Sequence, residues 1–225
     1  EDFQDPFVWQ GLDGVAGAGA TGATNAFTSC KGTGYAHVKG AGQTITCPVY
    51  YATSNGGLNI GMDQAADEGI EIVWPSIQFT IGTSAAFFAE FKLKAEDWSG
   101  TDDLALGFRK YQTFAAAMVT YTDYAALGKN GVDDNIVIRT DLNDGGETGT
   151  DTTDNFADTV LKTLRVNVSA AGVVTYLIDG IAPTVTAAFT ADTGDVVVPF
   201  CYFLHSTDVA GTAVLSLAEV GLQAS

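Results

Sequence analysis

Basic residues are scarce in this chain of 225 residues, which has 10 lysines and arginines against 27 aspartates and glutamates. The formal net charge is therefore 10 − 27 = −17. Nucleic-acid binders neutralise phosphates with lysine and arginine, and anionic membrane surfaces attract the same side chains. The composition therefore argues against both kinds of partner. The sequence also lacks an apolar run of about 20 residues, the length that a membrane-spanning helix needs.

Cysteine and histidine are also rare, with 3 cysteines and 2 histidines in the chain. Three cysteines without a CxxC pair exclude a disulfide scaffold and a cysteine-type zinc site. Cys30 and Cys47 are close enough in the sequence to form a disulfide in an oxidising compartment, or all three cysteines are small buried hydrophobic residues. Cys201 lies in the apolar run 196–204, which predicts that it belongs to the core.

Apolar residues are plentiful, at 46% of the chain with 11% aromatic residues, which excludes disorder of the whole chain. From residue 70 onward, short segments alternate apolar and polar residues, the period of a half-buried β-strand. In the segment 86–94, Phe87, Phe91 and Leu93 fall on one face. The segment 196–205 is apolar on both faces, as a central strand would be. Further strands are predicted at 70–74, 76–81, 103–110, 135–140 and 213–222.

Two segments, 164–168 and 173–178, are predicted to form a β-hairpin. Each alternates apolar and polar residues, Ala171-Gly172 supplies the turn, and Asp179-Gly180 ends the second strand. The segment 114–127 is ambiguous, because its alanines permit a helix whereas its valine, threonines and tyrosines favour a strand. We prefer a strand that is followed by a turn.

About ten predicted strands, no convincing helix and no internal repeat indicate an all-β protein, an antiparallel two-sheet sandwich in one domain. Residues 11–61 differ from the rest, because they are rich in glycine, alanine and threonine. We predict that residues 1–60 form an extended Gly-rich N-terminal arm with the first short strands, and that residues 61–225 form the sandwich. The arm would dock on the sandwich or on a neighbouring subunit. Its aromatic residues, the predicted assembly contacts, are Phe3, Phe7 and Trp9.

The segment 141–158 is rich in Asp, Thr and Gly, which predicts a long polar loop. Its carboxylates, from Asp141 to Asp154, could supply oxygens to Ca²⁺, which takes about 6–8 such ligands. Their spacing does not match that of an EF-hand loop. A solvated acidic loop without a cofactor is the preferred interpretation, and a Ca²⁺ site at Asp141–Asp154 is the alternative.

No group of residues predicts catalysis. A retaining glycosidase needs two carboxyl groups about 5–5.5 Å apart, whereas the nearest pair, Glu68 and Glu71, would face opposite sides of a strand. The lichenase-type signature Glu-x-Asp-x-x-Glu and the hydrolase motif GxSxG are both absent. Residues 17–22 match GxGxxG, but no βαβ pattern surrounds them. We therefore predict that the protein is not an enzyme and assign no catalytic residue.

The segment 164–183, LRVNVSAAGVVTYLIDGIAP, resembles the core hairpin of concanavalin A-like, laminin G-like jelly-roll domains. Within 87–222, the segments 91–110 and 151–158 are similar to virion proteins of tailed phages from marine environments. This resemblance implies a jelly-roll sandwich that serves as a capsid decoration subunit on the outer surface of the virion. The implied partners are the major capsid protein or other virion proteins, together with further copies of this chain.

The alternative that the jelly-roll resemblance implies is a lectin-like module that binds glycans, either free or as a tail or fibre adhesin. Trp98, Tyr121 and Tyr124 are the candidate glycan contacts, because they are aromatic residues close to Asp or Asn in the sequence. The same three side chains could instead belong to the core or staple loops. In either role, the net charge predicts a stability that depends on ionic strength.

Overall fold

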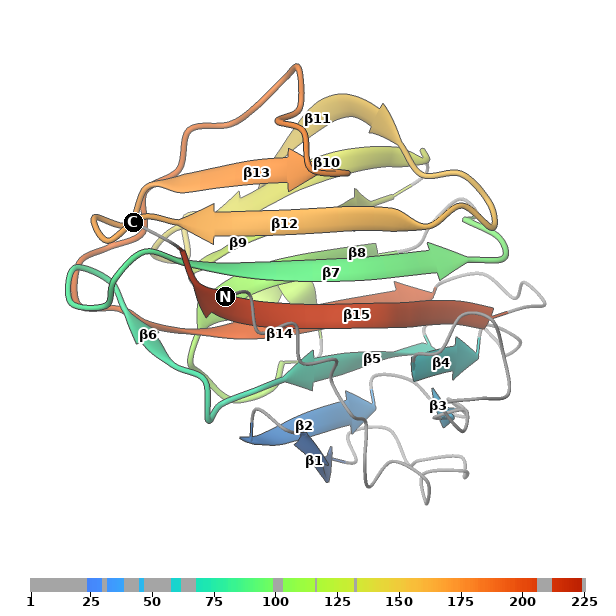
Figure 1. Ribbon diagram of the computed structural model, residues 1–225, viewed down its shortest axis with the longest axis horizontal. Helices are drawn as coiled ribbons and strands as arrows, with labels where there is room; N and C mark the ends of the chain where they lie inside the picture. The colour runs from blue at the N-terminus through green and yellow to red at the C-terminus, as the bar shows by residue number, and fades with distance from the viewer. Residues whose placement is uncertain are drawn as a thin grey trace.

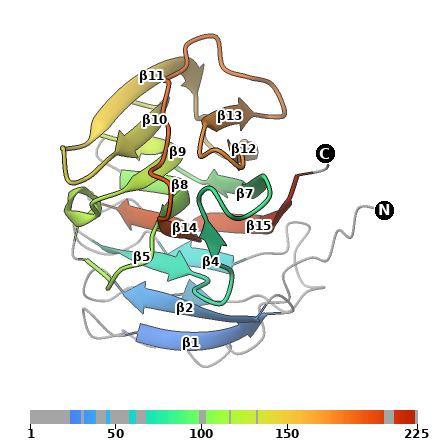
Figure 2. The same cartoon turned by 90° about the vertical axis from the view of Figure 1, so that its left-hand side faces the viewer.

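The computed structural model describes residues 24–29, 32–38, 45–46, 58–61, 68–98, 103–115, 117–131, 133–205 and 212–223 (Figure 1). Two antiparallel sheets form the described part, and they lie face to face as two layers (Figure 2). The predicted all-β antiparallel sandwich is therefore confirmed. In this part of the chain, no helix is long and apolar enough to cross a membrane. Phe3, Phe7, Trp9, Cys30 and Cys47 lie outside the described residues.

The larger sheet has the strand order β1-β2-β5-β14-β8-β9-β10-β11, and β6 also pairs with β14. Its strands are β1 (Thr24–Ser29), β2 (Gly32–Val38), β5 (Glu68–Val73), β6 (Phe79–Thr80), β8 (Asp103–Lys110), β9 (Tyr124–Asn130), β10 (Asn135–Asp141), β11 (Thr148–Asn155) and β14 (Val196–His205).

The smaller sheet has the order β13-β12-β7-β15-β4-β3. Its strands are β3 (Ile45–Thr46), β4 (Leu58–Gly61), β7 (Phe87–Ala95), β12 (Lys162–Val168), β13 (Val174–Ile178) and β15 (Thr212–Leu222). The predicted hairpin is the β12–β13 pair, in which Leu164 lies opposite Ile178. Because β2 pairs with β5 and β4 pairs with β15, strands from residues 24–61 extend both sheets.

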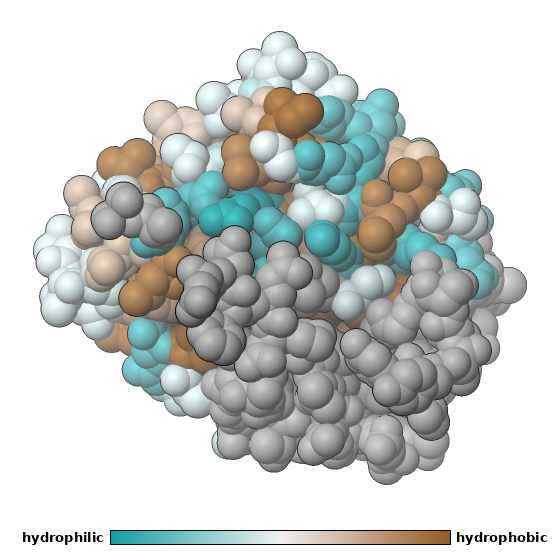
Figure 3. Space-filling model, in the orientation of Figure 1, coloured by the Kyte–Doolittle hydropathy of each residue, from teal (hydrophilic) through white to brown (hydrophobic). Residues whose placement is uncertain are grey.

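Alternation along each strand builds the core between the sheets. In β7, the side chains of Phe87, Ala89, Phe91 and Leu93 are buried against the larger sheet. The Phe87 ring stacks on Phe79 with a centroid distance of 4.1 Å. On the other face of β7, Glu90 and Lys92 belong to the outer surface of the smaller sheet, which is hydrophilic along its centre (Figure 3).

The outer face of the larger sheet is covered as well. A second buried cluster there joins Val198, Phe200 and Tyr202 of β14 to Met118 and Tyr121, which lie in the segment between β8 and β9. This explains why β14 is apolar on both faces, as the sequence predicted: its two faces meet two different layers. We call residues 111–123 the covering segment.

Two predicted elements are wrong in detail. The segment 114–127 is neither a continuous helix nor a continuous strand, because it contains a single 3₁₀ turn, Met118–Thr120, before β9 begins at Tyr124. The segment 141–158 is not a long loop, because it contains strand β11. β-branched threonines favour this strand, and the buried Thr152 hydroxyl donates to the Ile136 carbonyl at 2.5 Å.

Candidate functional site

A groove opens on the outer face of the larger sheet, where the covering segment leaves β8. It encloses about 400 Å³, within the range that small-molecule sites occupy. We call it the aromatic groove, because three of its residues are aromatic. It is lined by Tyr35, Val73, Pro75, Arg109, Tyr111, Gln112, Thr113 and Phe114.

One residue of the groove lining, Arg109, belongs to a buried ion pair. Arg109 points to the outer face of β8, and its Nε donates to Glu71 Oε1 of β5 at 2.8 Å. Both side chains are almost inaccessible to solvent, at 1% and 0% exposure. Glu71 also accepts a short hydrogen bond from the Tyr121 hydroxyl of the covering segment. Burial, and then the charge of Glu71, raise the pKa of Tyr121, so this hydroxyl keeps its proton and remains a donor.

The same ion pair holds the covering segment in place. Arg109 Nη1 donates to the carbonyl oxygens of Lys110 at 3.0 Å and of Gln112 at 3.1 Å. The guanidinium carbon lies 4.4 Å from the Tyr121 ring centroid and 5.8 Å from that of Phe114. Such cation–π contacts are favourable where water is excluded. Arg109 therefore fixes the backbone from which the groove residues project.

Small residues on the sheet make room for this arrangement. Ala105 of β8 and Ala126 of β9 belong to the same buried cluster as Met118 and Tyr121. Longer side chains at the two alanine positions would occupy the space that the covering segment fills. The sequence of the sheet thus determines how closely the segment approaches it.

A second buried cation is Arg139 of β10. Arg139 pairs with Asp103, and its Nη2 lies 2.6 Å from Glu147 Oε2. Burial opposes ionisation of Glu147, but hydrogen bonds from Arg139 and the charge of that residue lower its pKa. Tyr124 donates to the same carboxylate at 2.7 Å. The adjacent hollow, which includes Asn130 and Asp151, is polar and has no aromatic residue in its lining.

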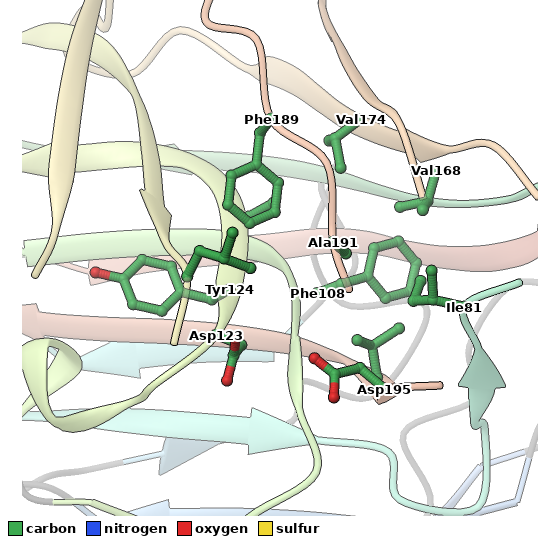
Figure 4. A pocket seen from close by; sticks show the side chains of 12 residues that line it. Ile81, Phe108, Asp123, Tyr124, Val168, Val174, Phe189, Ala191 and Asp195 are labelled. Atoms are coloured by element: carbon green, nitrogen blue, oxygen red, sulfur yellow. The ribbon is translucent and has the colours of Figure 1, made fainter. Parts of the chain in front are cut away.

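A third cavity is a gap in the core. Figure 4 shows Phe108, Val168, Val174 and Phe189 converging on it from both sheets and from the connection after β13. It offers about 20 Å³, room for roughly one water molecule. Its lining is almost entirely apolar, whereas ligand sites combine apolar walls with polar groups that orient the ligand.

Two acidic side chains at the edge of this gap are held by Lys110, whose Nζ lies 2.7 Å from Asp195 and 3.4 Å from Asp123. Burial opposes ionisation of Asp123, but the Asn143 N–H, the Thr122 hydroxyl and the charge of Lys110 together lower its pKa. Asp123 thereby joins the end of the covering segment to the turn after β10.

The predicted glycan contacts Trp98, Tyr121 and Tyr124 are all buried, so none presents a ring face to solvent. Trp98 stacks on Phe156 with a centroid distance of 4.3 Å, and Tyr121 lies beneath the covering segment. This corrects the prediction in favour of the core interpretation. Tyr121 still contributes to the aromatic groove indirectly, because its hydroxyl donates to Glu71, the partner of the groove residue Arg109.

The predicted Ca²⁺ loop is divided between the turn after β10 and strand β11. Across the residues that the structure describes, no group of three or more His, Cys, Asp or Glu side chains is placed to hold a metal ion.

Sequence reasoning missed the groove residues themselves. A signal was present, since Glu71 and Arg109 are charges inside segments that otherwise predict buried strands. Buried charges are usually paired, so the two strands could have been expected to meet through an ion pair. Tyr111 and Phe114, which directly follow the second of these strands, would then have become site candidates.

No family model and no curated protein sequence matches the chain. Among solved structures, the T. cruzi calreticulin globular domain is similar with a TM-score of 0.56, 10% identity, and coverage of 81% of this chain and 80% of that one. The VIP36 exoplasmic/lumenal domain in its Ca²⁺/Man3GlcNAc-bound form has a TM-score of 0.56 and 12% identity, and the match covers 85% of this chain and 84% of that one. The Emp46p carbohydrate recognition domain in its potassium-bound form has a TM-score of 0.55 and 8% identity, and the match covers 82% of this chain and 87% of that one. At these identities the likeness shows the fold, which is the lectin-like, concanavalin A-like jelly roll.

Proposed function

We propose that this protein is a carbohydrate-binding domain and that its ligand lies in the aromatic groove. The observation that carries the proposal is an exposed aromatic ring, Tyr111, in the same groove as the buried, ion-paired Arg109. Tyr111 is 56% exposed although it borders a buried ion pair. Tyrosine offers an apolar ring face together with a hydrogen-bonding hydroxyl, which matches the apolar and hydroxyl faces of a sugar ring. The carbohydrate-binding neighbours of the same fold support this proposal.

The other groove residues supply complementary chemistry. Tyr35 and Phe114 are half-buried, so each presents part of its ring. Next to Tyr111, Thr113 adds a hydroxyl and Gln112 adds an amide, whose oxygen accepts from the Thr122 hydroxyl at 3.2 Å. Ligand sites commonly combine apolar walls with a few convergent polar groups, and the aromatic groove meets that description better than the other two cavities.

The test is binding to a panel of polysaccharides by affinity electrophoresis, with Tyr111→Ala as the variant. We expect wild-type protein to be retarded by at least one polymer and the variant to bind it about tenfold more weakly, equivalent to about 1.4 kcal/mol. Val119→Ala is the matched control, because Val119 is similarly exposed, at 62%, and belongs to the same covering segment but does not line the groove. Equal binding by wild type and Tyr111→Ala would refute the site.

A virion role is the second candidate, and it rests on the similarity of 91–110 and 151–158 to phage virion proteins. The observation in its favour is exposed apolar surface where β12 begins and β13 ends. Val160 and Leu161 are each 47% exposed and Ile181 is 73% exposed. Such surface suits contacts with a capsid protein or a second copy. Quantitative mass spectrometry of purified particles tests it, since a decoration subunit on the outer surface requires a copy number in simple ratio to the major capsid protein.

A further inference from the structure

Acidic residues outnumber basic ones in this chain by 27 to 10, yet the aromatic groove has no acidic residue in its lining and one basic residue, Arg109. The charge that a ligand meets in the groove therefore depends on the state of this guanidinium. Its partners decide whether the groove could receive a sugar with a carboxylate or a sulfate group.

The Arg109 side chain is already committed to protein oxygens. Nε donates to the Glu71 carboxylate at 2.8 Å, and Nη1 donates to the carbonyl oxygens of Lys110 and Gln112. One face of the guanidinium lies over the Tyr121 ring. With 1% of the side chain exposed, its positive charge is balanced inside the protein by Glu71 and does not reach a ligand as an unpaired charge.

The other basic residues of the larger sheet are committed in the same way. Lys110 follows Arg109 directly and so points to the opposite face of β8, where it pairs with Asp195 and Asp123. Lys129 Nζ donates to the carbonyl oxygens of Gly131 and Asp133 at 2.6 Å and 2.5 Å. Arg139 pairs with Asp103 and Glu147. Within the described strands of this sheet, each lysine and arginine therefore contacts carboxylate or carbonyl oxygens of the protein, although Lys110 is 36% exposed.

The remaining polar groups of the groove are uncharged, since they are the hydroxyls of Tyr35, Tyr111 and Thr113 and the amide of Gln112. Neutral donors and acceptors of this kind suit sugar hydroxyls. The formal charge of −17 adds a field that repels anions at low ionic strength. We infer that the aromatic groove selects uncharged glycans and excludes acidic ones, an inference that rests on the proposed function.

The experiment compares each neutral polysaccharide with its acidic counterpart on purified full-length protein. Suitable pairs are a β-glucan with the same glucan oxidised at C6, and methyl-esterified polygalacturonan with its de-esterified form, each at about 20 mM and 500 mM NaCl. We expect the neutral polymer that binds to keep its Kd within about twofold between the two salt concentrations. Its acidic counterpart should bind at least tenfold more weakly at low salt and recover part of that loss at high salt.

A charge introduced into the groove provides the converse test. Thr113 is exposed at the rim, so Thr113→Lys adds a cation without removing a buried contact. We expect this variant to bind the acidic counterpart several-fold more tightly than wild type does at low salt, and no change would contradict the charge argument.

The outcomes separate the inference from the function beneath it. Tighter binding of an acidic polymer than of its neutral counterpart, weakened by salt and by Tyr111→Ala, would overturn the selectivity and leave the carbohydrate-binding function standing. No binding to either class would overturn the proposed function and the selectivity with it. Binding that Tyr111→Ala does not weaken would refute the aromatic groove as the site, and with it the selectivity inferred for that groove.

Discussion

The buried Glu71–Arg109 pair should behave as one energetic unit, which a double-mutant cycle can measure. The single variants are Glu71→Gln, which keeps the shape and removes the negative charge, and Arg109→Met, which keeps the length of the chain and removes the positive charge. Each leaves the other charge at a site with no more than 1% exposure. The double variant removes both charges at once.

The expected magnitudes follow from burial. Removing one partner of a buried ion pair costs about 3–5 kcal/mol, because an uncompensated charge remains inside the protein. For a domain of this size, each 1 kcal/mol lowers the melting temperature by about 2–4 °C, so each single variant should lose roughly 6–20 °C. The double variant keeps no buried charge and loses mainly the two Arg109 hydrogen bonds to Lys110 and Gln112, at about 1 kcal/mol each.

Urea unfolding at pH 7, followed by tryptophan fluorescence, gives the free energy of unfolding for all four proteins. We expect a loss of about 2–3 kcal/mol in the double variant, well below the roughly 6–10 kcal/mol that the sum of the singles would give. Tyr121→Phe provides a milder fourth variant, with an expected loss of about 1–3 kcal/mol, because it removes the hydroxyl that donates to Glu71. Additive losses would refute the view that these charges stabilise each other.

Three further predictions concern pH, packing and salt. Because the pKa of Asp123 is lowered in the fold, its carboxylate stabilises the protein above about pH 4, and that contribution is lost as pH falls. The difference in unfolding free energy between wild type and Asp123→Asn should therefore shrink between pH 6 and pH 3. Gly128→Ala should destabilise by about 1–3 kcal/mol or more, because its Cβ would lie 1.7 Å from the Leu104 carbonyl oxygen. Gly149→Ala should cost less in the same urea titration, because its closest contact would be the end of the Asn130 side chain rather than backbone. Raising NaCl from about 50 to 500 mM should screen the repulsion of a −17 chain and raise the melting temperature by roughly 2–4 °C; an unchanged melting temperature would contradict this.

The sequence predicted those elements whose signals are local. Strand β7 alternates buried and half-buried residues from Ala89 to Ala95. The turn between β12 and β13 contains Gly172 at φ +85°, and the turn after β13 contains Gly180 at φ +82°. Strand β11 could not be predicted in this way, because five of its eight residues are exposed and its pairing with β10 decides its conformation. A polar edge strand and a polar loop have the same composition.

The candidate site was harder to predict because its residues are distant in the sequence. Tyr35, Glu71 and Arg109 come from β2, β5 and β8. These strands belong to one sheet because β5 pairs with β2 and β14, and β8 pairs with the other edge of β14. The sequence does not show that order. Trp98 and Tyr124 were chosen for their neighbours along the chain, whereas their burial is determined by contacts with distant residues such as Phe156 and Glu147.

The position of the groove follows from how the larger sheet is used. Its central strand β14 is buried on both faces, so a ligand cannot rest directly on the middle of the sheet. The proposed ligand site lies instead at the edge of the covering segment, where residues 111–114 follow a backbone that Arg109 contacts through two carbonyl oxygens. Since these four side chains contribute little to either core cluster, apart from the partly buried Phe114, the specificity of the groove can change through them while Glu71, Arg109 and Tyr121 preserve its shape.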